Sequence, residues 1–214
     1  MREKAVFVFA FIFFMLLVNL LAPYAVFAQP AYVVFKAGGY FPTGTLGRLG
    51  YGAGFNGEIS VGHYFIPRIL AVEIGSGYLQ TTLSQTSLTN DPILGTVTGT
   101  IENQVRAVPI IGTVKVRAPF LGLYVGAGGG FYATRLRIRA HGTKADGSPF
   151  SFNDCGWDTI AGGHVMAGLS FPITRWLFFG AEGKYIFTQK AHYFNKSYSS
   201  LDGFMATGNL MINF

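Results

Sequence analysis

The sequence predicts an all-β protein, a membrane-spanning antiparallel up-and-down β-barrel with eight strands as the preferred number. The chain is hydrophobic, with 12% charged residues, 16% aromatic residues and 29 glycines. After its first segment, no apolar run approaches the roughly 20 residues that a spanning helix needs. Apolar and polar residues instead alternate over many short segments, as in strands with one apolar face. Because backbone polar groups in hydrocarbon must be bonded internally, a closed barrel is the remaining way to span.

The first 28 residues predict a secretory signal peptide. A basic start precedes an apolar run over 5–22, and Val26-Phe27-Ala28 is suited to cleavage after Ala28. The alternative is an uncleaved transmembrane anchor, because the run is about long enough to span a bilayer. No cysteine lies near the cut, which argues against a lipoprotein. We therefore expect a cleaved signal peptide over 1–28 and an outer-membrane β-barrel over 29–214.

Eight alternating segments follow, each near the roughly nine to eleven residues that a tilted membrane strand needs. They cover about 31–41, 54–65, 70–80, 104–117, 121–133, 158–171, 176–189 and 201–214. Tight, proline-bearing turns alternate with long polar loops over 42–53, 81–103, 134–157 and 190–200. Outer-membrane barrels have short turns at the periplasmic end, so we expect extracellular long loops and periplasmic termini. A weak alternation over 93–101 leaves ten strands as an alternative.

The last segment predicts the strand that closes the barrel. One parity is apolar and comprises Phe204, Ala206, Gly208, Leu210, Ile212 and Phe214. The other parity is mixed polar, so the apolar set faces outward if the strand lies in a membrane. Phe214 then faces outward at the seam with the first strand.

The charged residues of the predicted strands fall on the inner parity. Three acids and three lysines share it, namely Lys36, Glu58, Glu73, Lys115, Glu182 and Lys184. A charge buried alone is costly, and pairing offsets that cost. Eight strands leave an interior just wide enough for side chains to fill. We interpret the six as a structural polar plug; a gate or a proton path is the alternative.

The fifth predicted strand contains a run of glycines, and a row of arginines follows it. Apolar residues from Leu121 to Ala127 share the parity on which Arg135, Arg137 and Arg139 later fall. Arginine facing lipid near the midplane costs about 2–4 kcal/mol. Either a bulge near Gly126–Gly130 shifts the parity, or the strand leaves the membrane. We favour the second, with the strand continuing as an external hairpin arm.

This arginine row is the best candidate for a partner site. Guanidinium groups bind phosphate in a bidentate manner, and lipopolysaccharide is the phosphate-bearing partner expected at an outer-membrane surface. A solvated, charged strand edge that discourages aggregation is the alternative. Nucleic acid is not expected as a partner, because these charges are confined to the loop tips of a membrane protein.

Other residues carry weaker signals. The four histidines lack metal-ligand spacing, so no metal and no cofactor are expected. His164 has inner parity, where hydrogen-bonded packing is favoured over chemistry. Cys155 is the only cysteine and is expected to be an idle loop thiol. Met205 and Met211 have inner parity and are interpreted as packing residues.

Taken together, several motifs resemble the small eight-stranded outer-membrane β-barrel family, which includes the OmpA membrane domain, OmpX and OmpW. They are the signal peptide, the opening run Ala31–Tyr40, Gly62-His63-Tyr64-Phe65, the segment Gly180–Tyr185 and the terminal Phe214. The resemblance implies the fold, the cell outer membrane, and assembly by the barrel-insertion machinery with Phe214 as its signal. It implies no single activity.

We therefore expect a non-enzymatic, monomeric integral outer-membrane protein with a plugged lumen. Its external loops would serve surface interaction or envelope stabilisation, since loops on a rigid scaffold usually carry recognition. One alternative is a conduit for small apolar solutes. A second is a lipid A-modifying hydrolase. Lipid A deacylases of this architecture have a His-x-Ser-Asn stretch, and the segment most similar to it here is His192–Asn195. In that segment Phe194 occupies the place of the serine nucleophile. Ser197 or Ser199 could substitute only if the fold brings one to a base.

Overall fold

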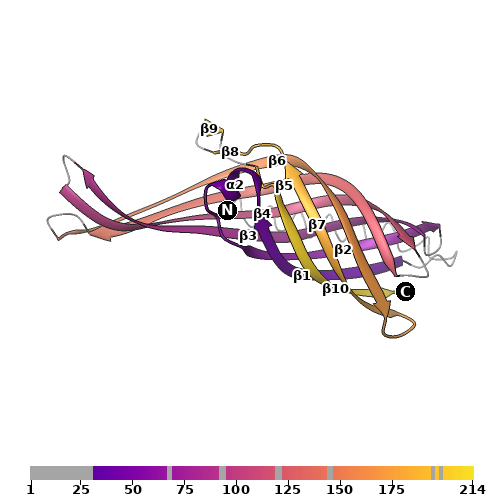
Figure 1. Ribbon diagram of the computed structural model, residues 1–214. Coiled ribbons are helices and arrows are strands. Elements are labelled where there is room, and N and C mark those ends of the chain that lie inside the picture. The colour runs from indigo at the N-terminus through magenta and orange to yellow at the C-terminus, as the bar shows by residue number, and fades with distance from the viewer. Residues whose placement is uncertain are drawn as a thin grey trace. The chain divides into compact units, whose positions relative to one another are not determined.

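The computed structural model describes residues 31–66, 69–91, 95–118, 122–143, 147–193, 196–197 and 200–214. The predicted signal peptide lies outside these ranges and stays a prediction. Eight antiparallel strands close into a barrel in the order β1-β10-β7-β6-β5-β4-β3-β2, with β1 also paired to β2 (Figure 1). Among the described residues, no helix is long and apolar enough to cross a bilayer.

The barrel strands match the eight predicted segments in order. They are β1 (Ala31–Pro42), β2 (Gly54–Ile66), β3 (Leu70–Asp91), β4 (Gly95–Ala118), β5 (Leu123–Thr143), β6 (Pro149–Pro172), β7 (Leu177–Thr188) and β10 (Gly203–Asn213). The connections carry a five-residue helix, α2 (Gly44–Arg48), and a small hairpin, β8 (His192–Tyr193) with β9 (Lys196–Ser197). The weak alternation near residue 101 belongs to β4 and adds no barrel strand in the described ranges.

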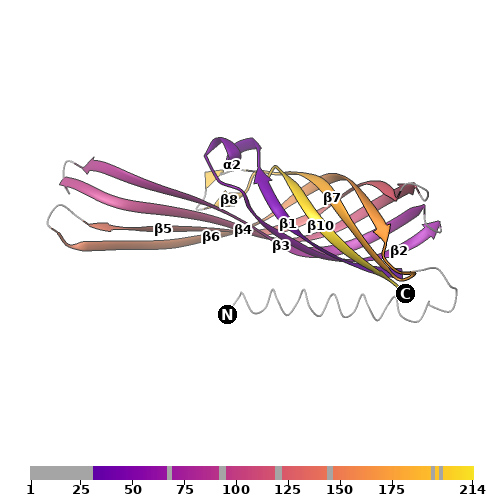
Figure 2. The ribbon, with the colours of Figure 1, turned by 60° about the horizontal axis from the view of Figure 1, so that its bottom comes forward.

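Two of the four predicted long loops are wrong. Residues 81–91 continue β3, and 95–103 already belong to β4, which pairs with them. Most of 134–157 likewise belongs to β5 and β6. The pairing of β3 with β2 ends at Gln80, and the pairing of β6 with β7 begins at Gly162. Beyond these residues β3, β4, β5 and β6 pair only with one another. They leave the barrel wall together as a four-stranded extension, here called the arm (Figure 2).

The outer surface of the barrel is apolar over the height of a membrane. On β5 the outward side chains run from Leu123 to Ala133 without a polar residue, and Val125 and Phe131 are 59% and 63% exposed. Eleven residues at about 3.3 Å each, tilted by about 40°, span roughly 25 Å, the height of an outer-membrane apolar band. The membrane-spanning eight-stranded β-barrel predicted from the sequence is therefore confirmed.

No bulge occurs along β5. Its register with β4 runs unbroken from Leu123 to Thr143, and so does its register with β6. Outward parity is therefore kept, and the arginines follow Ala133 on the same face. The strand leaves the apolar band and continues in the arm. Of the two explanations offered by the sequence, the bulge is excluded and the external hairpin arm is found.

Candidate functional site

The middle of the lumen holds the six predicted charged residues in one cluster, here called the charge cluster. Lys36 Nζ lies 2.9 Å from Glu58, 3.1 Å from Glu182 and 3.7 Å from Glu73. Lys115 Nζ lies 2.6 Å from Glu73 and 3.6 Å from Glu182. Lys184 contacts Glu58 and Glu182. Side chains from β1, β2, β3, β4 and β7 therefore meet at one level, and their formal charges cancel.

Neutral groups add hydrogen bonds to the charge cluster. The hydroxyl of Tyr32 donates to Glu73 at 3.0 Å, and that of Tyr124 donates to Glu182 at 3.0 Å. Ser60 donates to Glu58 at 3.0 Å. All three carboxylates are buried, and a buried carboxylate is tolerated when its oxygens are paired. The arrangement can lock five strands together.

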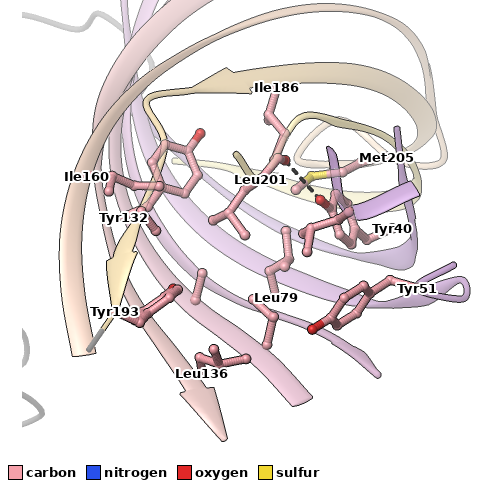
Figure 3. Close-up of a cluster of buried hydrophobic side chains, with 14 of the residues drawn as sticks. Tyr40, Tyr51, Leu79, Tyr132, Leu136, Ile160, Ile186, Tyr193, Leu201 and Met205 are labelled. Carbon is pink, nitrogen blue, oxygen red and sulfur yellow. Dashed lines mark hydrogen bonds between the residues drawn. The ribbon is translucent and has the colours of Figure 1, made fainter. Parts of the chain in front are cut away.

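Above the charge cluster, on the arm side, the lumen is filled by an apolar set here called the apolar cap (Figure 3). Its buried members are Tyr40, Leu46, Tyr51, Leu79, Val105, Ala107, Ile111, Tyr132, Leu136, Ile160, Ile186, Ala191, Tyr193, Leu201 and Met205. Several come from the connections rather than from the barrel wall, including Leu46 of α2 and Leu201 before β10. Figure 3 shows the hydroxyl of Tyr40 directed at the Leu201 carbonyl, a bond of 2.9 Å.

Hydrogen bonds hold the connections over the apolar cap. Thr43 N donates to Asp202 O at 2.9 Å, and Thr81 Oγ1 donates to Gly52 O at 2.7 Å. The Asp202 carboxylate accepts from Thr188 N at 2.8 Å. Burial raises the pKa of Tyr193 to about 12, so its phenol stays protonated at neutral pH. The sequence analysis missed this cap; the only sequence signal was the presence of Leu46 and Tyr51 in a loop expected to be polar.

A small cavity opens in the lumen on the other side of the charge cluster, toward the short turns. Tyr32, Tyr64, Arg117, Ser170 and Met211 are among its lining residues. The Arg117 guanidinium donates to the Tyr64 hydroxyl at 3.1 Å and to Ser170 Oγ, and it lies 5.3 Å from the centre of the Phe178 ring. The cavity ends at the charge cluster, since Glu73 and Lys115 also line it.

The predicted arginine row lies on the outward face of β5 in the arm. Arg135 is the register partner of Arg106 on β4 and of Trp157 on β6. Its guanidinium carbon lies 4.7 Å from the centre of the Trp157 ring. Arg137 donates to Asn153 Oδ1 at 3.3 Å. The structure therefore places Arg106 and Trp157 beside the row.

The remaining candidates lie apart from both clusters or serve packing. His164 is buried and shares a 2.9 Å hydrogen bond with Thr113, and Met205 and Met211 are buried in the lumen. Cys155 is exposed but lies within β6, so its placement in a loop was wrong. No group of side chains in the described ranges could hold a metal ion. At the seam, Phe214 N donates to Ala31 O at 2.9 Å, and the Phe214 side chain is exposed.

The region of the possible hydrolase lies beside the arm. His192 is the register partner of Ser197 in the β8–β9 hairpin. His192 N donates to Asp158 Oδ2 at 2.6 Å, and Nδ1 of the same histidine lies 4.0 Å from that oxygen. A serine, a histidine and an acid are therefore neighbours in the chain fold. Phe194 and Asn195, which the sequence comparison used, lie outside the described residues.

No protein-family model matches the chain, and no curated protein matches it. Several solved outer-membrane barrels are similar to it. Neisserial surface protein A is 14% identical, with 86% of this chain and 97% of that chain covered and a TM-score of 0.46. Ail of Yersinia pestis, solved with the heparin analogue sucrose octasulfate, is 12% identical, with 87% and 98% covered and a TM-score of 0.43.

A major outer membrane protein from Thermus thermophilus is 13% identical, with 87% of this chain and 100% of that chain covered and a TM-score of 0.43. Because the three TM-scores are below 0.5, the fold assignment rests on the strand pairing of this chain.

Proposed function

We propose that this chain is a non-enzymatic, monomeric barrel of the cell outer membrane that acts through its outer surface rather than through its lumen. One observation carries the proposal. Buried side chains lie in the lumen at two successive levels, those of the charge cluster and those of the apolar cap. A solute would have to break both. The conduit for small apolar solutes is therefore less well supported, because the six charges interrupt any apolar path.

The arm is the part of the molecule best suited to contacts. Its outward face carries Arg106, Arg135, Arg137 and Arg139, of which only Arg139 has an acidic register partner, Glu102, among the described residues. We propose that this face binds the phosphates of lipopolysaccharide and so stabilises the envelope. In this arrangement the long connections are extracellular and the termini periplasmic. Assembly would use the barrel-insertion machinery, with Phe214 as its signal.

The arginine row is tested by changing Arg135, Arg137 and Arg139 together to Gln. We expect the variant to fold as the wild type does, because the three side chains lie outside the apolar band, and to copurify with less lipopolysaccharide. Lipopolysaccharide phosphate per barrel and thermal unfolding are measured on the same preparation. Arg175→Gln, an exposed arginine beyond the short-turn end of β6, is the control and should change neither.

Two results would contradict this proposal. Unchanged lipopolysaccharide in the triple variant would reduce the row to a solvated strand edge. Loss of thermal stability with lipopolysaccharide retained would give the row a structural role. Raising the salt concentration should also release lipopolysaccharide from the wild type, because exposed charge contacts are screened.

The hydrolase is retained as a second candidate function on one observation, the neighbouring positions of His192, Ser197 and Asp158. A hydrolase needs the serine oxygen within hydrogen-bond reach of its base. Release of fatty acid from lipid A by the wild type and its loss in Ser197→Ala would replace the non-enzymatic proposal. The same assay without release from the wild type would remove the hydrolase.

A further inference from the structure

The arm has two outer strand edges, one on β3 and one on β6 (Figure 2). Backbone bonds from the barrel connections cover the base of each edge. The connection before β2 donates to Thr82 O at 3.3 Å, and the connection after β7 donates to Ala161 O at 2.9 Å. Beyond these contacts, residues 83–91 of β3 and 149–157 of β6 pair with no further strand in the described part of the chain. The two unpaired edges therefore have the same length, nine residues each.

The two edges also have the directions needed for pairing with each other. The bonds at the base show that the carbonyls of Thr82 and Ala161 point toward the unpaired side of their strands. Because backbone groups alternate along a strand, those of Ser84 on β3 and Cys155 on β6 point the same way. β3 runs toward the tip of the arm and β6 runs back from it. Two copies side by side in one membrane can therefore continue the sheet with an antiparallel ladder from β6 of one copy to β3 of the next.

On the β6 edge, a carboxylate already occupies one of these N–H groups. Asp154 Oδ1 accepts from Cys155 N at 2.8 Å. At the base of the edge, Asp158 accepts from Thr159 N at 2.8 Å and from His192 N of the β8–β9 hairpin at 2.6 Å. A strand added to β6 would displace the Asp154 carboxylate and place its own carbonyl oxygens beside that charge, which is unfavourable. Charged side chains directed at an edge are one means by which sheets avoid association.

The charges of the two edges single out Asp154. From Leu83 to Asn90 the sequence of β3 is uncharged, and Asp91 is the last residue of the strand. Between residues 149 and 157, Asp154 is the only charged residue of β6. Proline, which would interrupt a ladder, occurs in these two segments only at the first residue of β6. One carboxylate is therefore the main obstacle to pairing of the two edges.

We propose that the β3 edge of the arm fits the β6 edge of a second copy, and that Asp154 prevents this contact. The apolar bands keep neighbouring barrels at one height in the membrane, which brings their arms side by side. Each copy has one edge of each kind, so the contact is heterologous and can extend beyond a dimer. This inference rests on the proposed function, whose monomeric state it explains.

Cys155 provides the measurement, because it is the only cysteine of the sequence and is exposed on β6. Ser84→Cys adds a thiol on the same face of β3. The barrels are reconstituted at low density in phosphatidylcholine vesicles, treated with a flexible thiol-reactive cross-linker that tolerates a shift in register, and separated on a denaturing gel. We expect Asp154→Ala in this background to give a ladder of dimers and larger species. Its yield should exceed that of Ser84→Cys alone about tenfold or more, as for a change of one charge-assisted hydrogen bond.

Matched variants test the role of the carboxylate. Glu102→Ala removes the same charge from β4, inside the arm sheet, and should leave the yield of Ser84→Cys unchanged. Asp154→Asn removes the charge but keeps an acceptor for Cys155 N, so its yield should lie between those of Asp154 and Asp154→Ala. Arg175→Cys in place of Ser84→Cys puts the second thiol at the short-turn end and should give no ladder with Cys155.

The outcomes separate this inference from the proposed function. If Asp154→Ala gives no more product than its parent, the role of Asp154 is wrong while the monomeric barrel stands. If Ser84→Cys with Asp154 intact already gives the ladder, the monomeric state is wrong and this inference fails with it. Product that persists after Cys155→Ser would assign the contact to two β3 edges and overturn the β3–β6 pairing.

The same cross-linking in whole cells tests the identity of the partner. A product of Asp154→Ala that contains a different protein, in place of the ladder, would overturn the assignment to a second copy. Far-UV circular dichroism and the heat-modifiable band confirm that each variant is folded.

Discussion

At the scale of single residues, Glu182 is the centre of the charge cluster. It lies within 3.7 Å of all three lysines and accepts a hydrogen bond from Tyr124 at 3.0 Å. Each lysine also contacts at least one other carboxylate, so every lysine would keep an ion pair if Glu182 were neutral. The total charge of the cluster would nevertheless no longer be zero. Removing one carboxylate charge leaves three lysines against two acids in a buried site. An uncompensated buried charge of this kind lowers the free energy of unfolding.

Glu182→Gln is therefore expected to lower the free energy of unfolding by about 3–5 kcal/mol, the usual cost of breaking a buried ion pair on one side. Urea titration of the barrel in detergent, followed by the loss of the heat-modifiable band on a gel, measures it. Glu102→Gln removes the same charge from the arm, outside the apolar band, and should change stability by less than about 0.5 kcal/mol. Equal effects of the two changes would contradict a stabilising charge cluster.

At the scale of elements, the glycines of β5 serve close approach of strands rather than a bulge. A Cβ at Gly128 would lie 2.0 Å from the Gly112 carbonyl oxygen on β4, and one at Gly130 would lie 2.0 Å from the Ile110 carbonyl oxygen. Both positions have inner parity, where the barrel wall curves toward the lumen. Gly112 itself faces outward, and a Cβ there would meet nothing within 4 Å.

Gly128→Ala and Gly112→Ala form a matched pair on neighbouring strands. The first places a methyl group against backbone and should lower the free energy of unfolding by about 1–3 kcal/mol, the usual cost of overpacking. The second adds a methyl group to open space on the outer face and should be tolerated. The measurement is the urea midpoint of each variant in the same detergent. A larger loss for Gly112→Ala would show that the close approach of β4 and β5 is not what requires Gly128.

The sequence predicted those elements whose signal is local. The alternation of apolar and polar residues around Lys36, Glu58 and Glu182 was enough to place their strands. It also assigned the three side chains to the lumen, because parity alone selects the face of a strand. The arm had no such signal, since its Ser, Thr, Asn and Gly residues are as common in loops as in strands. The apolar cap depends on contacts such as that of Tyr40 with Leu201, which are far apart in the sequence.

At the scale of the whole molecule, two buried layers of side chains with different chemistry lie in the lumen, and the proposed function treats each as a seal. The charge cluster is held by pairing within the wall, whereas the apolar cap also requires the connections at the arm end to fold inward. Damage to one seal leaves the other in place. The arm, by contrast, shares no buried polar contact with the charge cluster in the described residues. Lumen closure and binding at the arm should therefore respond to different substitutions.

Planar-bilayer conductance tests this division. The wild type should stay near the baseline, and so should Glu182→Gln, with more noise because a lysine has lost its partner. Leu46→Ser with Leu201→Ser loosens the apolar cap, since each change removes a fully buried side chain, but the charge cluster still blocks ion flow. Only the combination of all three changes should give resolved openings, because ions then meet neither seal intact. The triple glutamine variant of the arm should match the wild type.

Two results would contradict this division. A large, steady conductance of the wild type would refute lumen closure and restore a transport function. Openings in either partial variant would show that one seal alone closes the barrel.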